Sequence, residues 1–206
     1  MKKNIIEEYN NYFRKKPTKW ASEDRNKFTF ARLAELFDKT PRTVLDIGCG
    51  NGHTIEFLSK KWINTKFYGL DLSDVAIDIA KRKNIQNALF KSCFLQDIEY
   101  DIDFDLVIML GVLEHFEDIK NALQHVIRLC SLDTIIYIEV PNCIAYPQSE
   151  HHEGFRRLTV GSKQIEWHLE RSTWENHFHD AGFEIIQSIK GPNIQSEFIW
   201  ALRMKP

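Results

Sequence analysis

The chain has 206 residues, of which 43% are hydrophobic and 27% are charged, and its formal net charge is −2. This length and composition suit one domain with a full core. The near-neutral charge argues against a general nucleic-acid binder, which would be strongly basic. No apolar run approaches the roughly 18 residues of a membrane span, and the polar start lacks the apolar core of a secretory signal. We therefore expect a cytoplasmic protein without membrane or nucleic-acid partners.

The N-terminal part, residues 1–40, is predicted to form a helical cap, with an amphipathic helix over residues 23–39. After it, short apolar runs alternate with patterns whose apolar residues lie three and four apart, as in helices. The runs typical of strands are 43–48, 66–71, 88–94, 104–110 and 134–140, and the helical patterns are 53–62, 73–83 and 118–129. Such alternation implies right-handed crossovers and a parallel sheet.

The last third of the chain departs from this alternation. Residues 141–171 form a 31-residue stretch with weak periodicity. Stretches of that length are more often functional than idle, so we expect a lid on the substrate side. A helix then opens with Ser172 and Glu175 in capping-box spacing and ends at Gly182. Two closing strands, 183–189 and 196–204, are near enough in sequence to pair as a hairpin. The whole chain, 1–206, is predicted to be a single α/β domain.

A glycine cluster is the strongest functional signal. The stretch VLDIGCGNGHT leads from the first expected strand into Gly48, Gly50 and Gly52. Glycines at the end of a strand allow the backbone to approach a ligand closely. A dinucleotide fingerprint would need a third glycine where His53 stands, and a phosphate-binding loop would need Gly-Lys-Ser/Thr where the sequence has Gly-His-Thr. Neither anion-binding motif fits.

Acidic residues at three expected strand ends indicate a different ligand. They are Asp46, Asp71 and Asp97. The carboxyl ends of parallel strands meet at the edge where such sheets bind ligands. Three carboxylates there disfavour a pyrophosphate. They suit a ligand with a cationic centre and hydroxyls, because a carboxylate can accept hydrogen bonds from a ribose or an amino group.

Four segments, in order, resemble the motifs of class I S-adenosylmethionine-dependent methyltransferases. They are LDIGCGNG, YGLDLS, FLQDIE and FDLVIMLGVLEHFED. The resemblance extends from about Thr43 to Met204. It implies a Rossmann-like sheet of seven mostly parallel strands with the last strand antiparallel and helices on both faces. It also implies an enzyme whose cofactor is S-adenosyl-L-methionine.

The resemblance further implies where the methionine end of the cofactor lies. The backbone around Gly48, Gly50 and Gly52 would surround the methionine and ribose portion. Asp46 would lie near the amino end, and Leu110 would line the methionine side.

The resemblance likewise assigns residues to the adenosine end. Asp71 would hold the ribose hydroxyls, and Leu72 would pack on the adenine. Asp97 would accept a hydrogen from the adenine amino group, and the backbone amide of Ile98 would meet a ring nitrogen.

The catalytic residues are less constrained. The sulfonium already activates its methyl group, so the reaction needs an aligned nucleophile in a water-free site. A general base is needed only if the nucleophile must lose a proton during attack. The candidates are Glu114 and His115 after the fourth strand and His168 in the expected lid, with His151 and His152 as further possibilities. Each of these histidines could instead be a structural or an exposed loop residue.

A metal-assisted reaction is the main alternative. Ubiquinone-type O-methyltransferases and small-RNA 2′-O-methyltransferases carry Glu-x-x-Glu-His at this turn, and in the RNA enzymes a later histidine completes a metal site. Here Gly111 replaces the first Glu, which leaves Glu114, His115 and His168 as a weaker ligand set. We therefore assign no metal ligands.

The sequence thus predicts methyl transfer from S-adenosylmethionine to an oxygen or nitrogen of a small-molecule acceptor, with a nucleotide-linked sugar as one acceptor class. A non-catalytic scaffold that binds the cofactor is the rival from another class. The sequence leaves the acceptor and the oligomeric state open.

Overall fold

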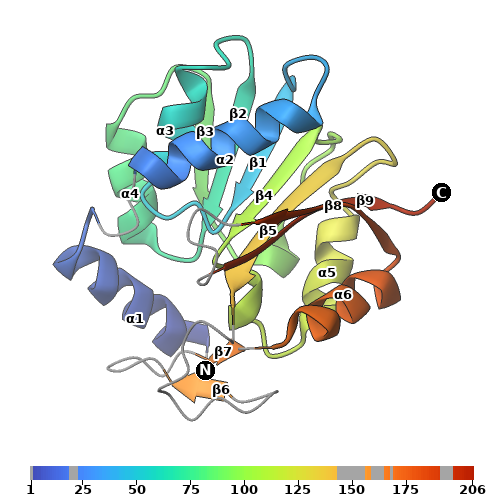
Figure 1. Cartoon of the computed structure of the whole chain (residues 1–206). Helices are drawn as coiled ribbons and strands as arrows, with labels where there is room; N and C mark the ends of the chain where they lie inside the picture. The colour runs from blue at the N-terminus through green and yellow to red at the C-terminus, as the bar shows by residue number, and fades with distance from the viewer. Residues whose placement is uncertain (1, 19–22, 143–155, 159–164, 168, 191–196) are drawn as a thin grey trace. The chain divides into compact units, whose positions relative to one another are not determined.

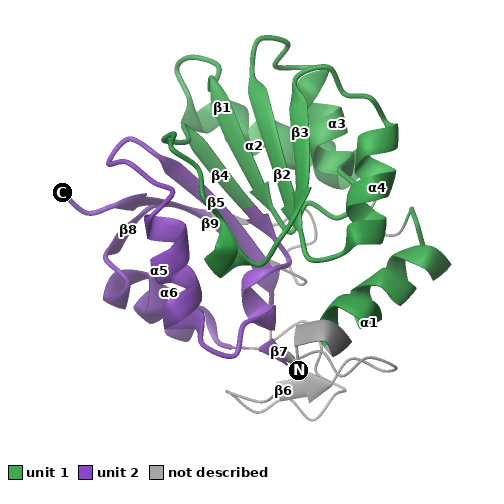
Figure 2. Cartoon of the chain, turned by 180° about the vertical axis from the view of Figure 1, so that it is seen from behind, with its two compact units in different colours: residues 1–108 green, residues 109–206 purple. Residues whose placement is uncertain are grey.

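The computed structural model describes residues 2–18, 23–142, 156–158, 165–167, 169–190 and 197–206. The chain divides into two compact units, residues 1–108 and 109–206. Figure 2 shows the two units in different colours. The boundary falls within strand β4 (Leu106–Leu110).

The strands form one seven-stranded sheet in the order β3-β2-β1-β4-β5-β9-β8. Strands β1, β2 and β3 pair in parallel, whereas β9 pairs antiparallel with both β5 and β8. The order of the strands and the reversed last strand confirm the predicted Rossmann-like, mostly parallel fold. A second sheet is a short hairpin of β6 and β7.

Unit 1 contains four α-helices, the first strands and a short 3-10 helix. Its elements are α1 (Lys2–Lys15), α2 (Glu23–Leu36), β1 (Thr43–Ile47), α3 (His53–Ser59), β2 (Lys66–Asp71), α4 (Asp74–Arg82), β3 (Ala88–Ser92) and η1 (Leu95–Asp97). Helix α2 crosses the face of β1 and β2 (Figure 1). Val44, Leu45 and Phe67 of the strands are at most 1% exposed and form part of the core with Leu33 of α2.

Unit 2 begins within β4 and continues into the turn after it. Its elements are η2 (Leu113–His115), α5 (Ile119–Ile127), β5 (Ile135–Pro141), β6 (Arg156–Leu158), β7 (Ile165–Trp167), α6 (Arg171–Asp180), β8 (Phe183–Lys190) and β9 (Glu197–Met204). Strands β8 and β9 form the predicted hairpin, with Phe183 opposite Met204. Helices α5 and α6 lie side by side (Figure 1), and Phe178 of α6 packs against Trp200 of β9 at a ring-centroid distance of 5.2 Å.

Local side-chain chemistry explains where several helices begin and end. Ser73 caps α4 by accepting a hydrogen bond from the Ala76 amide, and Asp118 caps α5 through the Asn121 amide. Both caps match the preference of helix N-termini for short oxygen-bearing side chains. Gly182, just after α6, has a φ of 94°, the conformation that commonly terminates a helix.

The predicted capping box of the sixth helix is wrong. Helix α6 begins at Arg171, and its N-cap residue is Glu170, which makes no side-chain capping bond. The carboxylate of Glu175 instead accepts a hydrogen bond from the indole nitrogen of Trp200 at 2.9 Å. Glu175 therefore bonds to Trp200 of β9 in place of the backbone at the start of its own helix.

The two segments expected to form the cap and the lid both contain regular elements. Helix α1 falls within the expected N-terminal cap, and β6 and β7 fall within the expected lid, residues 141–171. Much of that lid, residues 143–155, 159–164 and 168, lies outside the described residues. Among the helices that the structure describes, none has the length and apolar composition needed to cross a membrane.

Candidate cofactor site and catalytic turn

The glycine turn after β1 is held against the end of β2. Gly48, Gly50 and Gly52 have φ values of 73°, 52° and 71°, which glycine adopts without the penalty that a Cβ atom imposes. The amides of Gly48 and Cys49 both donate to the carbonyl oxygen of Leu70, at 2.7 and 2.8 Å. The turn therefore has a defined position relative to the carboxyl end of β2.

Gly52 has a packing role in this turn. It is buried and is the N-cap residue of α3. A Cβ atom at this position would lie 2.9 Å from the Ala80 Cβ atom and 2.9 Å from the Phe90 ring. The absence of a side chain thus lets the start of α3 pack tightly against α4 and β3.

Asp71, the last residue of β2, is oriented by two backbone amides. Its Oδ1 atom accepts a hydrogen bond from the Ser73 amide and its Oδ2 atom from the Gly50 amide, each at 2.8 Å. Burial raises the pKa of Asp71 to about 6, although hydrogen bonds from the Ser73, Gly50 and Leu72 amides oppose the rise. The group is mostly ionised at neutral pH. Each carboxylate oxygen has a further lone pair, which a ligand hydroxyl could use.

Asp46 provides a second and more deeply buried carboxyl group. It lies in β1 and is 3% exposed. Burial, and to a smaller extent the charge of Asp71, raise its pKa to about 8, although the positive charge of Arg25 in α2 opposes the rise. A cation placed beside this group would favour its ionised form. Asp46 is therefore suited to the ammonium group of an amino-acid ligand.

The residues expected at the adenine are less closely connected. Leu72 is half-buried, and its carbonyl accepts from the Ser92 hydroxyl at 3.3 Å. Asp97 is exposed at the end of η1. The Ile98 amide donates to the Leu95 carbonyl at 3.4 Å, which is longer than the usual 2.9–3.0 Å for such bonds. The structure thus joins Asp71 to Gly50 and leaves Asp97 at the surface.

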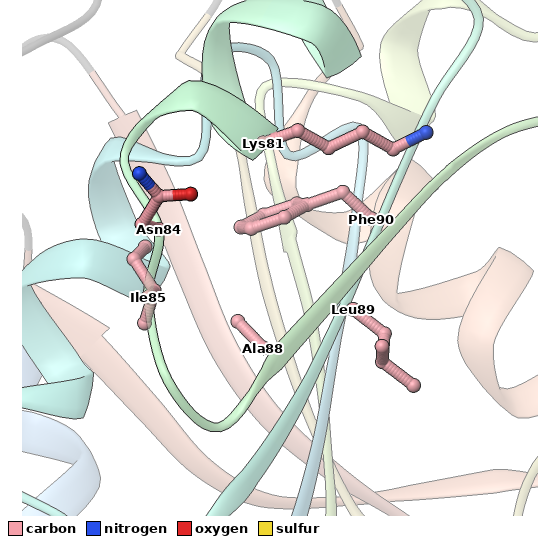
Figure 3. Close-up of a pocket in the computed structure, with 6 residues that line it drawn as sticks. All are labelled: Lys81, Asn84, Ile85, Ala88, Leu89 and Phe90. Carbon is pink, nitrogen blue, oxygen red and sulfur yellow. The ribbon is translucent and has the colours of Figure 1, made fainter.

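A pocket of about 260 Å³ lies at the other end of β3. Its lining residues are Lys81, Asn84, Ile85, Ala88, Leu89 and Phe90, shown in Figure 3. Ala88 is the first residue of β3, so the pocket lies at the opposite end of the strand from the edge that carries Asp71. Its lining contains no carboxylate or histidine and is unrelated to the candidate site.

Helix α1 rests on the glycine turn, a contact that the sequence analysis missed. The ring of Phe13, 5% exposed, lies 3.2 Å from where a Cβ atom of Gly50 would be. The side-chain amide of Asn51 donates to the Pro17 carbonyl at 2.6 Å. The sequence contains a signal for this helix and its packing face, because Tyr9 and Phe13 have the four-residue spacing of one helical face.

The candidate catalytic turn follows β4 in unit 2. Leu110 ends the strand and is half-buried. Gly111 has a φ of 68°, and a Cβ atom there would lie 3.4 Å from the Oε1 atom of Glu114. Its amide donates to the Glu139 carbonyl at 2.9 Å. A side chain at position 111 would be strained in this backbone conformation.

Glu114 and His115 lie close to each other in η2. Glu114 is 3% exposed, and its Oε1 atom is 4.0 Å from the Nε2 atom of His115, whose side chain is 25% exposed. This distance exceeds that of a hydrogen bond but allows electrostatic attraction if the imidazole takes up a proton. A buried carboxylate beside a partly exposed imidazole can therefore assist proton transfer.

The lid segment is connected to this turn. The Trp167 indole nitrogen of β7 donates to the Phe116 carbonyl at 2.8 Å. The next residue, His168, lies outside the described residues, as do His151 and His152. Within the part of the chain that the structure describes, no group of three His, Cys, Asp or Glu side chains could hold a metal ion. The metal alternative requires His168 and is not tested by this geometry.

Comparison with curated proteins finds methyltransferases. The malonyl-[acyl-carrier protein] O-methyltransferase of Acetivibrio thermocellus is 24% identical over 109 residues, which are 52% of this chain and 38% of that protein. The ajmaline N-methyltransferase of Rauvolfia serpentina is 28% identical over 115 residues, 53% of this chain and 39% of that protein. The chain thus spans about two-fifths of the length of these relatives.

Comparison with solved structures supports the fold. The 1,6-didemethyltoxoflavin-N1-methyltransferase of Burkholderia thailandensis, crystallised with 1,6-didemethyltoxoflavin and S-adenosylhomocysteine, matches with a TM-score of 0.72 and 16% identity. The match covers 100% of this chain and 87% of that one. The methyltransferase-domain family matches residues 21–188, more than half of the chain. The predicted family is therefore confirmed: the chain belongs to the class I S-adenosylmethionine-dependent methyltransferases.

Proposed function

We propose that this protein transfers the methyl group of S-adenosylmethionine to an oxygen or nitrogen atom of a small-molecule acceptor. The observation that carries the proposal is the Asp71 carboxylate, whose two oxygens are fixed by the amides of Gly50 and Ser73. A carboxylate held in this way at a strand end is pre-organised to accept hydrogen bonds from the ribose hydroxyls. The family membership supports the same cofactor.

The residues of unit 1 would bind the cofactor as a set. Asp71 would hold the ribose, and Asp46 would pair with the ammonium group of the methionine portion. The backbone at Gly48 and Gly50 would lie along the ligand. At the adenine end, Leu72, Asp97 and the amide of Ile98 would take the roles that the resemblance assigns to them. We propose Gly52 mainly as support for the turn, because it is packed against Ala80 and Phe90.

The turn after β4 would serve the chemistry. When bound, S-adenosylmethionine supplies an activated methyl group. Leu110 would line the methionine side of the site, and His115 would accept the proton of a hydroxyl acceptor. Glu114, 4.0 Å from the imidazole, would stabilise the imidazolium that forms. His168 is the second candidate base, because it follows Trp167, which is bonded to this turn.

Two segments would cover the site. We propose that residues 1–40, with α1 against the glycine turn, form a helical cap. Residues 141–171 would form the substrate-side lid, supported by the Trp167–Phe116 hydrogen bond. A cover that excludes water would favour methyl transfer to the acceptor.

The acceptor class rests on the relatives. One of them is named as an O-methyltransferase and another as an N-methyltransferase, and the similar solved structure holds 1,6-didemethyltoxoflavin. The test is to incubate the purified protein with methyl-labelled S-adenosylmethionine and fractionated metabolites, nucleotide-linked sugars included. We expect label in a small-molecule product together with stoichiometric S-adenosylhomocysteine. Tight cofactor binding without turnover in any fraction would favour the non-catalytic scaffold.

A further inference from the structure

Asn10 is a buried amide on the helix that rests against the glycine turn. It lies in α1 and is 6% exposed. Its Oδ1 atom accepts two hydrogen bonds, from the Ser73 hydroxyl at 2.7 Å and from the Val75 amide at 3.3 Å. Both views of the molecule show α1 beside one end of α4 (Figures 1 and 2). Asn10 therefore connects α1 to the start of α4.

Ser73 passes this connection to the candidate ribose site. It is fully buried, and its hydroxyl accepts from the Ala76 amide at 3.1 Å while donating to Asn10. Its own amide donates to the Oδ1 atom of Asp71 at 2.8 Å. One residue thus receives its orientation from α1 and from the helix cap, and in turn orients Asp71.

The network continues to the glycine turn. The other oxygen of Asp71 accepts from the Gly50 amide at 2.8 Å, and Phe13, one turn after Asn10 in α1, packs against Gly50. Helix α1 therefore reaches the same loop by two routes, one through hydrogen bonds and one through apolar contact. A displacement of α1 would disturb both carboxylate oxygens.

We propose that Asn10 is a positioning residue for the cofactor, which acts through Ser73 to hold the Asp71 carboxylate in its ribose-binding orientation. The inference rests on the proposed role of Asp71 and deepens it. It makes α1 part of the binding site, so that the cofactor binds tightly only while α1 is docked. Loss of the Asn10 oxygen leaves the buried Ser73 hydroxyl and the Val75 amide without their acceptor. Ser73 should then shift, and its amide should no longer hold the Asp71 carboxylate in the same orientation.

Two substitutions of Asn10 distinguish its role as a hydrogen-bond acceptor from the effect of its side-chain size. Asn10→Leu keeps a similar size but removes the acceptor, whereas Asn10→Asp keeps an oxygen that can accept from both Ser73 and Val75. Asn11→Leu is the matched control, because Asn11 is exposed and its oxygen accepts a surface hydrogen bond from Arg14. Affinity for S-adenosylhomocysteine is measured by calorimetry at pH 8, above the pKa of Asp71.

We expect Asn10→Leu to bind S-adenosylhomocysteine roughly tenfold more weakly, as for the loss of one hydrogen bond, with Asn10→Asp and Asn11→Leu close to the unsubstituted protein. In an Asp71→Ala background the effect of Asn10→Leu should disappear, because the two residues act in series. A merely structural Asn10 would lower the melting temperature of the free protein and leave this affinity unchanged, which would overturn the proposal.

Equal losses in Asn10→Leu and Asn10→Asp, or an undiminished effect in the Asp71→Ala background, would also overturn it. Failure of the proposed function has a different signature. In that case the unsubstituted protein would not bind S-adenosylhomocysteine, or Asp71→Ala would bind it normally. If Asp71→Ala weakens binding as expected but Asn10→Leu binds as tightly as the unsubstituted protein, only the role of Asn10 is refuted.

Discussion

The glycine turn of unit 1 and the turn after β4 in unit 2 use similar parts to different degrees. Each follows a strand with a glycine at positive φ, and each has a carboxylate close by. In the first turn, two backbone amides orient Asp71 at 2.8 Å. In the second, Glu114 and His115 are 4.0 Å apart. Backbone amides therefore fix the orientation of Asp71. The proposed proton transfer depends instead on the side chains of Glu114 and His115, which are not hydrogen-bonded to each other.

Replacement of the candidate base should have the largest effect in the second turn. For a hydroxyl acceptor, His115→Asn should lower the rate by roughly 10²–10⁴-fold, because the acceptor proton loses its destination. Affinity for S-adenosylhomocysteine should hardly change, because the His115 imidazole is not among the groups proposed to bind the cofactor. Rates measured at saturating cofactor, with calorimetry beside them, check this expectation.

His168→Asn is the companion variant, since we expect one of the two histidines to matter and added chelator to have no effect. Loss of activity with chelator and recovery with Mg²⁺ or Zn²⁺ would show that a metal takes part. If neither substitution nor chelator changes the rate, the acceptor is an amine that arrives deprotonated and the turn acts by positioning alone.

In the first turn the effect should appear in binding. Asp71→Ala should weaken the affinity for S-adenosylhomocysteine by about 1.5–3 kcal/mol, the range for hydrogen bonds to a charged acceptor. In the unsubstituted protein the affinity should also fall as the pH drops through about 6, because burial raises the pKa of Asp71 to about 6 and the protonated group is a poorer acceptor. Calorimetry between pH 5 and 8 measures both. An unaltered affinity in Asp71→Ala would remove the ribose assignment.

Asp46 should show a conflict between stability and binding. Burial raises its pKa to about 8, so the folded chain keeps a proton that the unfolded chain loses near pH 4. The unfolded state then binds fewer protons, and the free energy of unfolding contributed by this group falls as the pH rises from about 4 to 8. Asp46→Asn should therefore stabilise the free protein at pH 8.5, by about 1–3 kcal/mol, and by less at pH 5.

The same variant should bind the cofactor more weakly, because an amide cannot balance the ammonium charge. Thermal unfolding at the two pH values, with and without S-adenosylhomocysteine, separates the two effects. A variant that is less stable than the unsubstituted protein at pH 8.5 would contradict the account of Asp46 as a destabilising buried acid.

The two segments proposed as covers should give the smallest effect. Cleavage within residues 1–22 and 141–171 by a low concentration of protease should slow a few-fold when cofactor and acceptor are both present, because bound ligands favour the closed form. Mass spectrometry of the fragments locates the cuts. Equal cleavage with and without ligands would exclude a moving cover.

The difference between the two turns also explains which parts of the fold and of the candidate site could be predicted from the sequence. The seven strands of the main sheet were all predicted, since strand runs and helix periods reflect local burial. The association of Asp71 with the glycine turn followed from strand ends meeting at one edge. No such rule predicts the orientation of the His115 side chain, because that orientation depends on contacts between segments distant in sequence.

The other misses have the same cause. Glu175 pairs with Trp200 of β9 instead of capping its own helix, and Asn10 bonds to Ser73, which is 63 positions away. No local pattern encodes either contact. The contact of α1 with the glycine turn was a different kind of miss. The helical spacing was present in the sequence, but the polar and aromatic composition of the segment is not typical of a core-facing helix.

Direct titration of the purified protein with S-adenosylhomocysteine and, separately, with NADH tests the central claim, that the edge of unit 1 is a site for an adenosyl amino acid. We expect one S-adenosylhomocysteine site per chain and no heat of binding for NADH, because the carboxylates of Asp46 and Asp71 suit an ammonium and a ribose and disfavour a pyrophosphate. Binding of NADH in place of S-adenosylhomocysteine would contradict the account.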